Sequence, residues 1–126
     1  MNILVVEDDI SVGKLIFQCA KQWGHHVEST GTGEEAVKKV SQDPFDLILL
    51  DVMLPDGFGY EKIPAFKTYH PDVNIIVMTG YSTPEMERTV REFGITYYMA
   101  KPININELKN ILDHLSNKRK GEASDE

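Results

Sequence analysis

The hydrophobic and polar positions divide the chain into five short apolar runs that alternate with five segments of helical spacing. Almost wholly apolar runs of this length predict buried strands, and apolar residues three or four positions apart predict amphipathic helices. The predicted strands are residues 3–6, 25–29, 47–50, 73–78 and 95–100. The predicted helices are residues 12–23, 32–43, 60–69, 83–93 and 104–115.

This alternation of strands and helices defines the expected fold class. Consecutive strands joined by helices pair in parallel, and right-handed crossovers place helices on both faces of the sheet. We therefore predict an α/β fold of three layers, with a doubly wound, five-stranded parallel sheet between two layers of helices. Capping patterns, in which a glutamate follows the capping residue by three positions, begin helices at Thr32, Ser82 and Asn104.

Composition and charge narrow the class of protein. At 126 residues the chain has the size of one domain, which we place at residues 1–117; the charged or small residues 118–126 predict a flexible tail or the start of a linker. No apolar run approaches the roughly 20 residues that cross a bilayer, and no basic signal segment precedes the first strand, so we expect a cytoplasmic protein without a membrane partner. The net charge of −7 opposes binding to phosphate backbones, so direct contact with nucleic acid is not expected.

Polar residues capable of chemistry follow four of the predicted strands. Glu7 and Asp8 follow the first strand, Asp51 follows the third, Thr79 the fourth, and Lys101 the fifth. Because the carboxyl ends of parallel strands share one edge of the sheet, these side chains should gather there.

The gathered residue types are those that phosphoryl transfer requires. Neighbouring carboxylates repel by roughly 4 kcal/mol per pair at an effective dielectric near 20, so they need a cation, and an all-oxygen ligand set favours Mg²⁺. Asp51 could then attack phosphorus, Lys101 could neutralise charge on the phosphoryl oxygens, and Thr79 could donate a hydroxyl hydrogen bond.

Four motifs in the chain resemble those of the response-regulator receiver domains of two-component signalling. The resemblance covers residues 2–117. The motifs are ILVVED at 3–8, LLDVMLP at 49–55 followed by Gly59, VMTG at 77–80, and YMAKP at 98–102. The family resemblance implies a flavodoxin-like sheet with strand order 2-1-3-4-5 and a cis peptide bond between Lys101 and Pro102.

The resemblance also implies roles for individual residues. Glu7, Asp8, Asp51 and the backbone carbonyl of Met53 would hold Mg²⁺. Asp51 would receive a phosphoryl group from a sensor histidine kinase or a phosphotransfer protein. The domain would then catalyse only its own phosphorylation and dephosphorylation, and would not be an enzyme acting on a separate substrate.

A conformational switch follows from the same resemblance. Phosphorylation of Asp51 would draw Thr79 inward and let Tyr98 move from an outward to an inward position. The changed face would comprise the helix at 83–93, the last strand and the helix at 104–115. We expect a downstream effector protein or domain, or a second copy of the chain, to dock there.

Three positions depart from the common family pattern. Glu7 stands where many relatives have aspartate, and Gly80 stands where alanine is frequent. Pro64 falls inside the third predicted helix, where an interior proline costs about 3 kcal/mol. We therefore predict that this helix is broken or begins only near Ile63.

Three alternative functions were weighed against this interpretation. A Mg²⁺-dependent aspartyl phosphatase of the haloacid dehalogenase type would need a second aspartate two residues after Asp51, where this chain has Met53. A flavodoxin-like cofactor binder would need a phosphate-cradling loop where the acidic residues 7–9 stand. A degenerate receiver that acts only as an interaction module is disfavoured because four residues are present together: Asp8, Asp51, Thr79 and Lys101.

Overall fold

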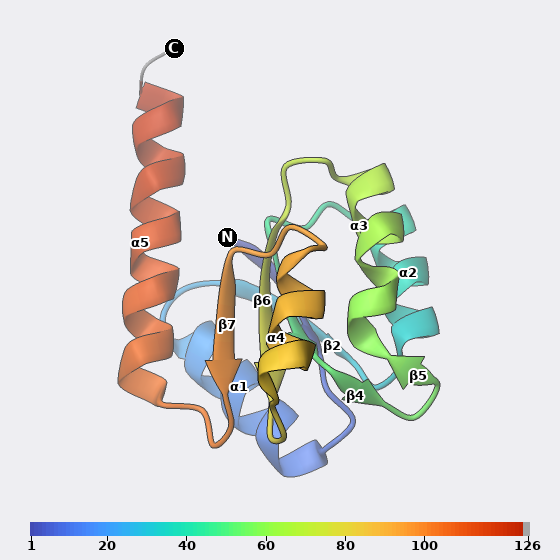
Figure 1. The fold of residues 1–126 in the computed structure, drawn as a ribbon. Helices are drawn as coiled ribbons and strands as arrows, with labels where there is room; N and C mark the ends of the chain where they lie inside the picture. The colour runs from blue at the N-terminus through green and yellow to red at the C-terminus, as the bar shows by residue number, and fades with distance from the viewer. Residues whose placement is uncertain (125–126) are drawn as a thin grey trace.

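Five parallel strands form the central sheet of the computed structural model, which describes residues 1–124 (Figure 1). The strands lie in the order β2-β1-β3-β6-β7. Two further short strands, β4 (Met53–Leu54) and β5 (Gly57–Phe58), stand outside this sheet, so the order equals the predicted 2-1-3-4-5 once they are left out of the count. The strands of the sheet are β1 (Asn2–Val6), β2 (His26–Thr30), β3 (Leu47–Asp51), β6 (Asn74–Thr79) and β7 (Tyr97–Ala100).

Helices cover both faces of the sheet, which confirms the predicted three layers. Helices α1 and α5 lie on one side of the sheet and α2, α3 and α4 on the other (Figure 1), and a separate core cluster joins each group to the sheet. Strand residues alternate between the two clusters, so that Leu47 and Leu49 face one and Ile48 and Leu50 the other. The helices are α1 (Ile10–Gln22), α2 (Gly33–Gln42), α3 (Ile63–Tyr69), α4 (Pro84–Arg91) and α5 (Ile105–Ser124).

The predicted capping residues begin the helices with one shift of position. The Thr32 hydroxyl accepts the Glu35 N–H at the start of α2, and the side-chain oxygen Oδ1 of Asn104 accepts the Glu107 N–H at the start of α5. At α4 the capping residue is Thr83, one position after the predicted Ser82. Proline then occupies the first turn of α4, where its missing N–H has no intrahelical partner to lose.

The third helix is interrupted as its proline predicts. Residues Gly59–Lys62 form a short 3₁₀ helix, η1, and α3 begins at Ile63. Pro64 therefore stands in the first turn of α3 rather than in its interior. The proline is accommodated because the first N–H groups of a helix make no intrahelical hydrogen bond.

Two segments differ from the sequence prediction. The residues after Asp51, for which no strand was predicted, fold into an antiparallel hairpin of β4 (Met53–Leu54) and β5 (Gly57–Phe58). The last helix runs to Ser124, beyond the predicted end at Leu115, so it includes residues 118–124 of the segment predicted to be a tail or the start of a linker. Lysine, arginine, glutamate and alanine in this segment are strong helix formers. Residues 125 and 126 of the predicted tail lie outside the described part, and the domain boundary at 117 stays a prediction.

Candidate functional site

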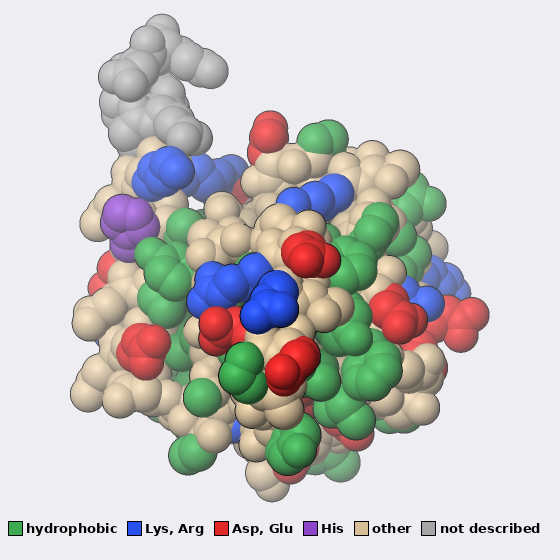
Figure 2. Space-filling model, viewed as in Figure 1, with side chains coloured by type: hydrophobic (Ala, Val, Ile, Leu, Met, Phe, Trp, Pro, Cys, Tyr) green, Lys and Arg blue, Asp and Glu red, His purple; other side chains and the backbone are tan. Residues whose placement is uncertain are grey.

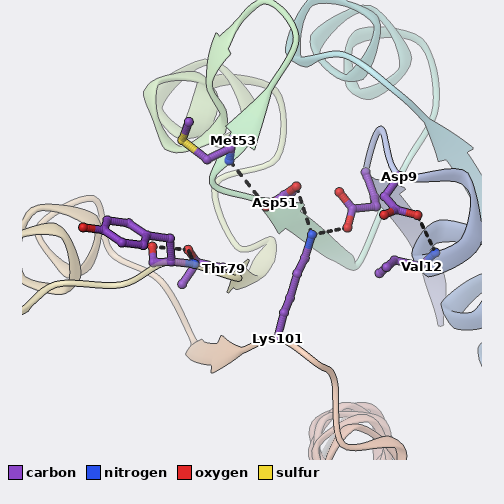
Figure 3. Close-up of polar contacts among 8 residues, drawn as sticks. Asp9, Val12, Asp51, Met53, Thr79 and Lys101 are labelled. Atoms are coloured by element: carbon purple, nitrogen blue, oxygen red, sulfur yellow. Dashed lines mark hydrogen bonds and ion pairs between the residues drawn. The ribbon is translucent and has the colours of Figure 1, made fainter.

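The polar residues predicted at the strand ends lie at one edge of the sheet, and Figure 3 shows Asp51, Thr79 and Lys101 among them. Glu7 and Asp8 follow β1, Asp51 ends β3, Thr79 ends β6 and Lys101 follows β7. The strand register aligns the carboxyl ends of β1, β3 and β6, because Leu50 of β3 pairs with Val6 of β1 and with Val77 of β6. Residues from four separate segments of the chain therefore lie at the same edge of the sheet.

Three carboxylates of this edge form a compact acidic cluster. Glu7, Asp8 and Asp51 each offer an oxygen, and these three atoms lie within 4.8 Å of one another. Glu7 and Asp51 are buried, whereas Asp8 is exposed to solvent. The second carboxylate oxygen of Glu7, Oε2, is buried without a hydrogen-bond partner among residues 1–124. A hard divalent cation that prefers oxygen ligands fits this donor set, because it would offset the negative charges of the carboxylates and could be coordinated by Glu7 Oε2.

Lys101 supplies the positive charge that faces the cluster. Its ammonium Nζ lies 3.1 Å from Asp51 Oδ2 and also contacts Glu7 Oε1. Burial alone would lower the pKa of Lys101, but the hydrogen bonds to Glu7 and Asp51 outweigh burial and raise it. Burial, together with the neighbouring Asp51 carboxyl, raises the pKa of Glu7 to about 7 despite the contact with Lys101. One lysine therefore does not fully compensate two buried carboxylates.

Thr79 lies at this edge, but its hydroxyl is hydrogen-bonded away from Asp51. The hydroxyl donates to the Tyr81 carbonyl at 2.6 Å and accepts the Tyr81 N–H at 3.1 Å. Figure 3 shows Thr79 apart from the lysine and the carboxylates. For the hydroxyl to donate to a group bound on Asp51, it must first release the Tyr81 carbonyl.

Tyr98 is half-buried on β7 and packs against the core cluster that includes α4. Its phenol is hydrogen-bonded to the Ser82 hydroxyl, and the Arg91 guanidinium lies 5.7 Å from the centre of its ring. Neither contact was predicted from the sequence. No sequence signal could have found them, because Ser82 lies in the loop before α4 and Arg91 at the end of α4, and no local pattern pairs these residues with Tyr98 on β7.

The chain directly after Asp51 is closely packed against it. The Met53 N–H lies 3.4 Å from Asp51 Oδ1, while the Met53 side chain is exposed. Gly59 is buried and donates its N–H to the Val52 carbonyl at 2.7 Å. A Cβ atom at Gly59 would lie only 2.1 Å from the Asp51 carbonyl oxygen, so glycine is required there. Gly59 was recognised in the sequence as part of a motif, but this close approach to Asp51 was not predicted.

The peptide bond between Lys101 and Pro102 is cis, as the family resemblance implies. Within residues 1–124, none of the helices combines the length and the apolar character that a bilayer-spanning segment requires.

Comparison with known proteins identifies the family. The model of the response regulator receiver domain matches residues 3–113, and the chain belongs to this family. It is 33% identical over 116 residues to the DNA-binding transcriptional regulator NtrC of Azospirillum brasilense, covering 92% of this chain and 24% of that protein. The chain spans about a quarter of the length of the first curated relatives it matches.

Solved structures agree with this assignment. A CheY-like response regulator receiver domain protein from Methanospirillum hungatei JF-1 is similar with a TM-score of 0.87 and 30% identity, covering 95% of this chain and 97% of that one. A response regulator protein from Burkholderia pseudomallei, crystallised with a phosphorylated aspartic acid, a calcium ion and citrate, has a TM-score of 0.82 and 26% identity, covering 98% of this chain and 74% of that one.

Proposed function

We propose that this receiver domain accepts a phosphoryl group on Asp51 from a sensor histidine kinase or a phosphotransfer protein, in a Mg²⁺-dependent reaction. The observation that carries the proposal is the buried Asp51 carboxylate, which lies within 4.8 Å of two further carboxylates and 3.1 Å from the Lys101 ammonium. The phosphorylated aspartic acid of the related Burkholderia pseudomallei protein supports the same chemistry.

The metal ligands in this proposal are Glu7, Asp8, Asp51 and the backbone carbonyl of Met53. Oxygen-only ligands suit Mg²⁺, which keeps several waters and so leaves positions for phosphoryl oxygens. When bound, Mg²⁺ would offset negative charge on the phosphoryl group and on the carboxylates. The unpartnered Glu7 Oε2 and the excess of carboxylates over lysine support a cation at this position.

The residues of the chain carry out the transfer itself. A carboxylate oxygen of Asp51 forms a bond to phosphorus while the bond between phosphorus and the donor's imidazole nitrogen breaks, and the imidazole keeps the electron pair and takes up a proton. The Lys101 ammonium, held by Asp51, stays beside the developing charge. The domain thus catalyses only its own phosphorylation and the later loss of the phosphoryl group to water.

The signal would leave through the face formed by α4, β7 and α5. Phosphoryl oxygens on Asp51 would compete with the Tyr81 carbonyl for the Thr79 hydroxyl, and movement of the loop that carries Ser82 would disturb Tyr98. An unchanged Tyr98 ring environment after addition of beryllofluoride, a phosphoryl mimic, would contradict this switch.

The partner at this face would be a downstream effector protein or domain, or a second copy of the chain. Figure 2 shows side chains of both charges over α4 with hydrophobic side chains beside it. A mixed surface of this kind suits a protein partner better than a phosphate backbone, in agreement with the net charge of −7. The relatives of which this chain spans about a quarter include the transcriptional regulators ZraR and NtrC, so an effector attached to such a domain is part of the proposal.

The decisive experiment is phosphorylation by a small donor. The chain is incubated with Mg²⁺ and acetyl phosphate, and the intact mass is measured for the wild type and for Asp51→Asn. We expect the mass of one phosphoryl group to be gained by the wild type only, and only when Mg²⁺ is present. A gain in neither protein would overturn the proposal and favour a receiver that acts solely as an interaction module.

A further inference from the structure

The hairpin that follows Asp51 is tied to a helix that is distant in sequence. The carboxylate of Asp56, at the hairpin tip, accepts two hydrogen bonds from the first turn of α2. The Gly33 N–H lies 3.0 Å from Oδ1, and the Glu34 N–H lies 2.9 Å from Oδ2. The two oxygens of one side chain thus bridge segments that are more than twenty residues apart.

This contact completes the N-terminus of α2. A helix leaves its first N–H groups without intrahelical partners, and the Thr32 hydroxyl accepts only the Glu35 N–H. The Asp56 carboxylate accepts the two preceding N–H groups of the helix, those of Gly33 and Glu34. Its negative charge lies at the positive end of the helix dipole. These backbone hydrogen bonds lower the pKa of Asp56, so the carboxylate is ionised at neutral pH.

The packing around Gly33 keeps the two segments close together. Gly33 is buried, and a Cβ atom there would lie 3.0 Å from Cγ of Lys62 and 3.5 Å from Oδ1 of Asp56. Because the glycine has no side chain, the hairpin tip and η1 can approach the backbone of α2 directly.

The base of the hairpin is fixed against Asp51. The Met53 N–H lies 3.4 Å from Asp51 Oδ1, and the Gly59 N–H donates to the Val52 carbonyl at 2.7 Å. A movement of the tip is therefore passed to Met53 through only two intervening residues, Leu54 and Pro55. The tip contact and the base contacts together determine where the Met53 peptide lies beside the acidic cluster.

We propose that Asp56 is a positioning residue for the divalent-cation site: by anchoring the hairpin on α2, it holds the backbone carbonyl of Met53 in place beside Glu7, Asp8 and Asp51. This inference rests on the proposed function, which places Mg²⁺ at that cluster. Asp56 itself lies at the opposite end of the hairpin from the cluster and makes its hydrogen bonds to α2.

The test is a Mg²⁺ titration of the full chain, followed through the amide NMR signals of Asp8 and Asp51. For Asp56→Ala we expect the dissociation constant for Mg²⁺ to rise about 3- to 10-fold. Loss of a residue that supports a metal ligand commonly costs about 10- to 100-fold in affinity, and the effect here should be smaller because the hairpin is short and the Met53 carbonyl is only partly released. Asp56→Asn removes the charge but keeps an acceptor oxygen, so it should bind Mg²⁺ more tightly than Asp56→Ala.

Thr32→Ala is the matched control. It removes another cap of the same helix, at a similar cost of about 1 kcal/mol, without touching the hairpin. We expect its Mg²⁺ affinity to equal that of the wild type.

The possible outcomes separate the two proposals. If the wild type binds Mg²⁺ and Asp56→Ala binds it equally well, the positioning role is overturned while the proposed function stands. If Thr32→Ala weakens binding as much as Asp56→Ala, loss of helix stability explains the effect and the positioning role is again overturned. If Asp56→Asn binds Mg²⁺ as weakly as Asp56→Ala, the charge of Asp56 rather than its anchoring hydrogen bonds is responsible, and the positioning role is overturned. If the wild type does not bind Mg²⁺, both the proposed function and this inference fail.

Discussion

Gly59 lies where the chain turns back past the end of β3, and substitution by alanine is the most direct test of this packing. The added Cβ would lie 2.1 Å from the Asp51 carbonyl oxygen, 3.1 Å from Cδ1 of Leu50 and 3.2 Å from Cδ1 of Leu54. The two leucine side chains can move, but the carbonyl belongs to the central strand of the sheet. The substitution therefore forces two backbone segments apart.

The cost can be estimated from this geometry. Because Cβ atoms essentially never approach within 3.0 Å, the backbones must separate by about 0.9 Å in a core packed at crystal-like density. Overpacking of this kind costs about 1–3 kcal/mol, and weakening the hydrogen bond from Gly59 to Val52 adds about 1 kcal/mol. We expect Gly59→Ala to lower the free energy of unfolding by about 2–4 kcal/mol, a large part of the roughly 5–15 kcal/mol typical of a domain.

The assay is urea unfolding followed by far-UV circular dichroism. With an m-value of about 2 kcal/mol per molar, the midpoint should fall by about 1–2 M. Gly80→Ala is the matched control: its Cβ would meet no atom nearer than Cδ of Lys101 at 3.8 Å, and Gly80 is not among the glycines with positive φ. We expect its midpoint to be unchanged or raised, since alanine reduces the freedom of the unfolded chain by about 0.4–1 kcal/mol.

Two results would refute this reasoning. A Gly59→Ala midpoint within about 0.3 M of the wild type, less than the 1 kcal/mol that any real clash costs, would show that the segment moves aside freely. Equal destabilisation by Gly80→Ala would show that glycine itself, rather than the contact with Asp51, accounts for the loss.

Two further predictions concern the charged groups. Lys101→Met in metal-free buffer should lower the free energy of unfolding by about 2–4 kcal/mol, because it leaves two buried carboxylates without their cation, and added Mg²⁺ should restore part of the loss. Asp56→Asn should be less stable than the wild type at neutral pH, and the difference in stability should disappear as the pH falls below about 4. The pKa of Asp56 is lower in the folded chain than in the unfolded chain. The stabilisation by ionised Asp56 is therefore present above the unfolded pKa and is lost as the pH falls through the folded pKa.

Each of these predictions has a control and a contrary result. Lys109→Met removes an exposed ion pair with Asp113 and should change stability by less than about 1 kcal/mol. An equal loss for the Lys101 and Lys109 variants would contradict the importance of the buried pairing. A stability difference between wild type and Asp56→Asn that persists unchanged at pH 3 would show that ionisation of Asp56 does not stabilise α2.

Much of the fold could be predicted because its signals are local. The predicted strand at 47–50 consists of four apolar residues, and β3 is buried on both faces. Thr32 and Asn104 cap helices through hydrogen bonds that reach only three residues. Strand bounds were off by a residue or two, and the hairpin after Asp51 was missed because two-residue strands carry no periodic pattern.

The sequence by itself determined the parallel sheet, its helical layers and the presence of Glu7, Asp8, Asp51, Thr79 and Lys101 at one edge. A buried strand and the polar residues that follow it are recognisable from residues adjacent in sequence. Parallel pairing then brings the carboxyl ends of the strands together, regardless of the sequence that connects them.

Only the tertiary structure decided which atoms meet at that edge. The pairing of Lys101 with Glu7 as well as Asp51, the turn of the Thr79 hydroxyl toward Tyr81, and the anchoring of Asp56 on α2 all join distant segments or depend on side-chain rotation. Whether such a contact forms depends on differences of a few tenths of an ångström in the spacing of packed elements. Those distances are a property of the whole folded core, and no local pattern of residues contains them.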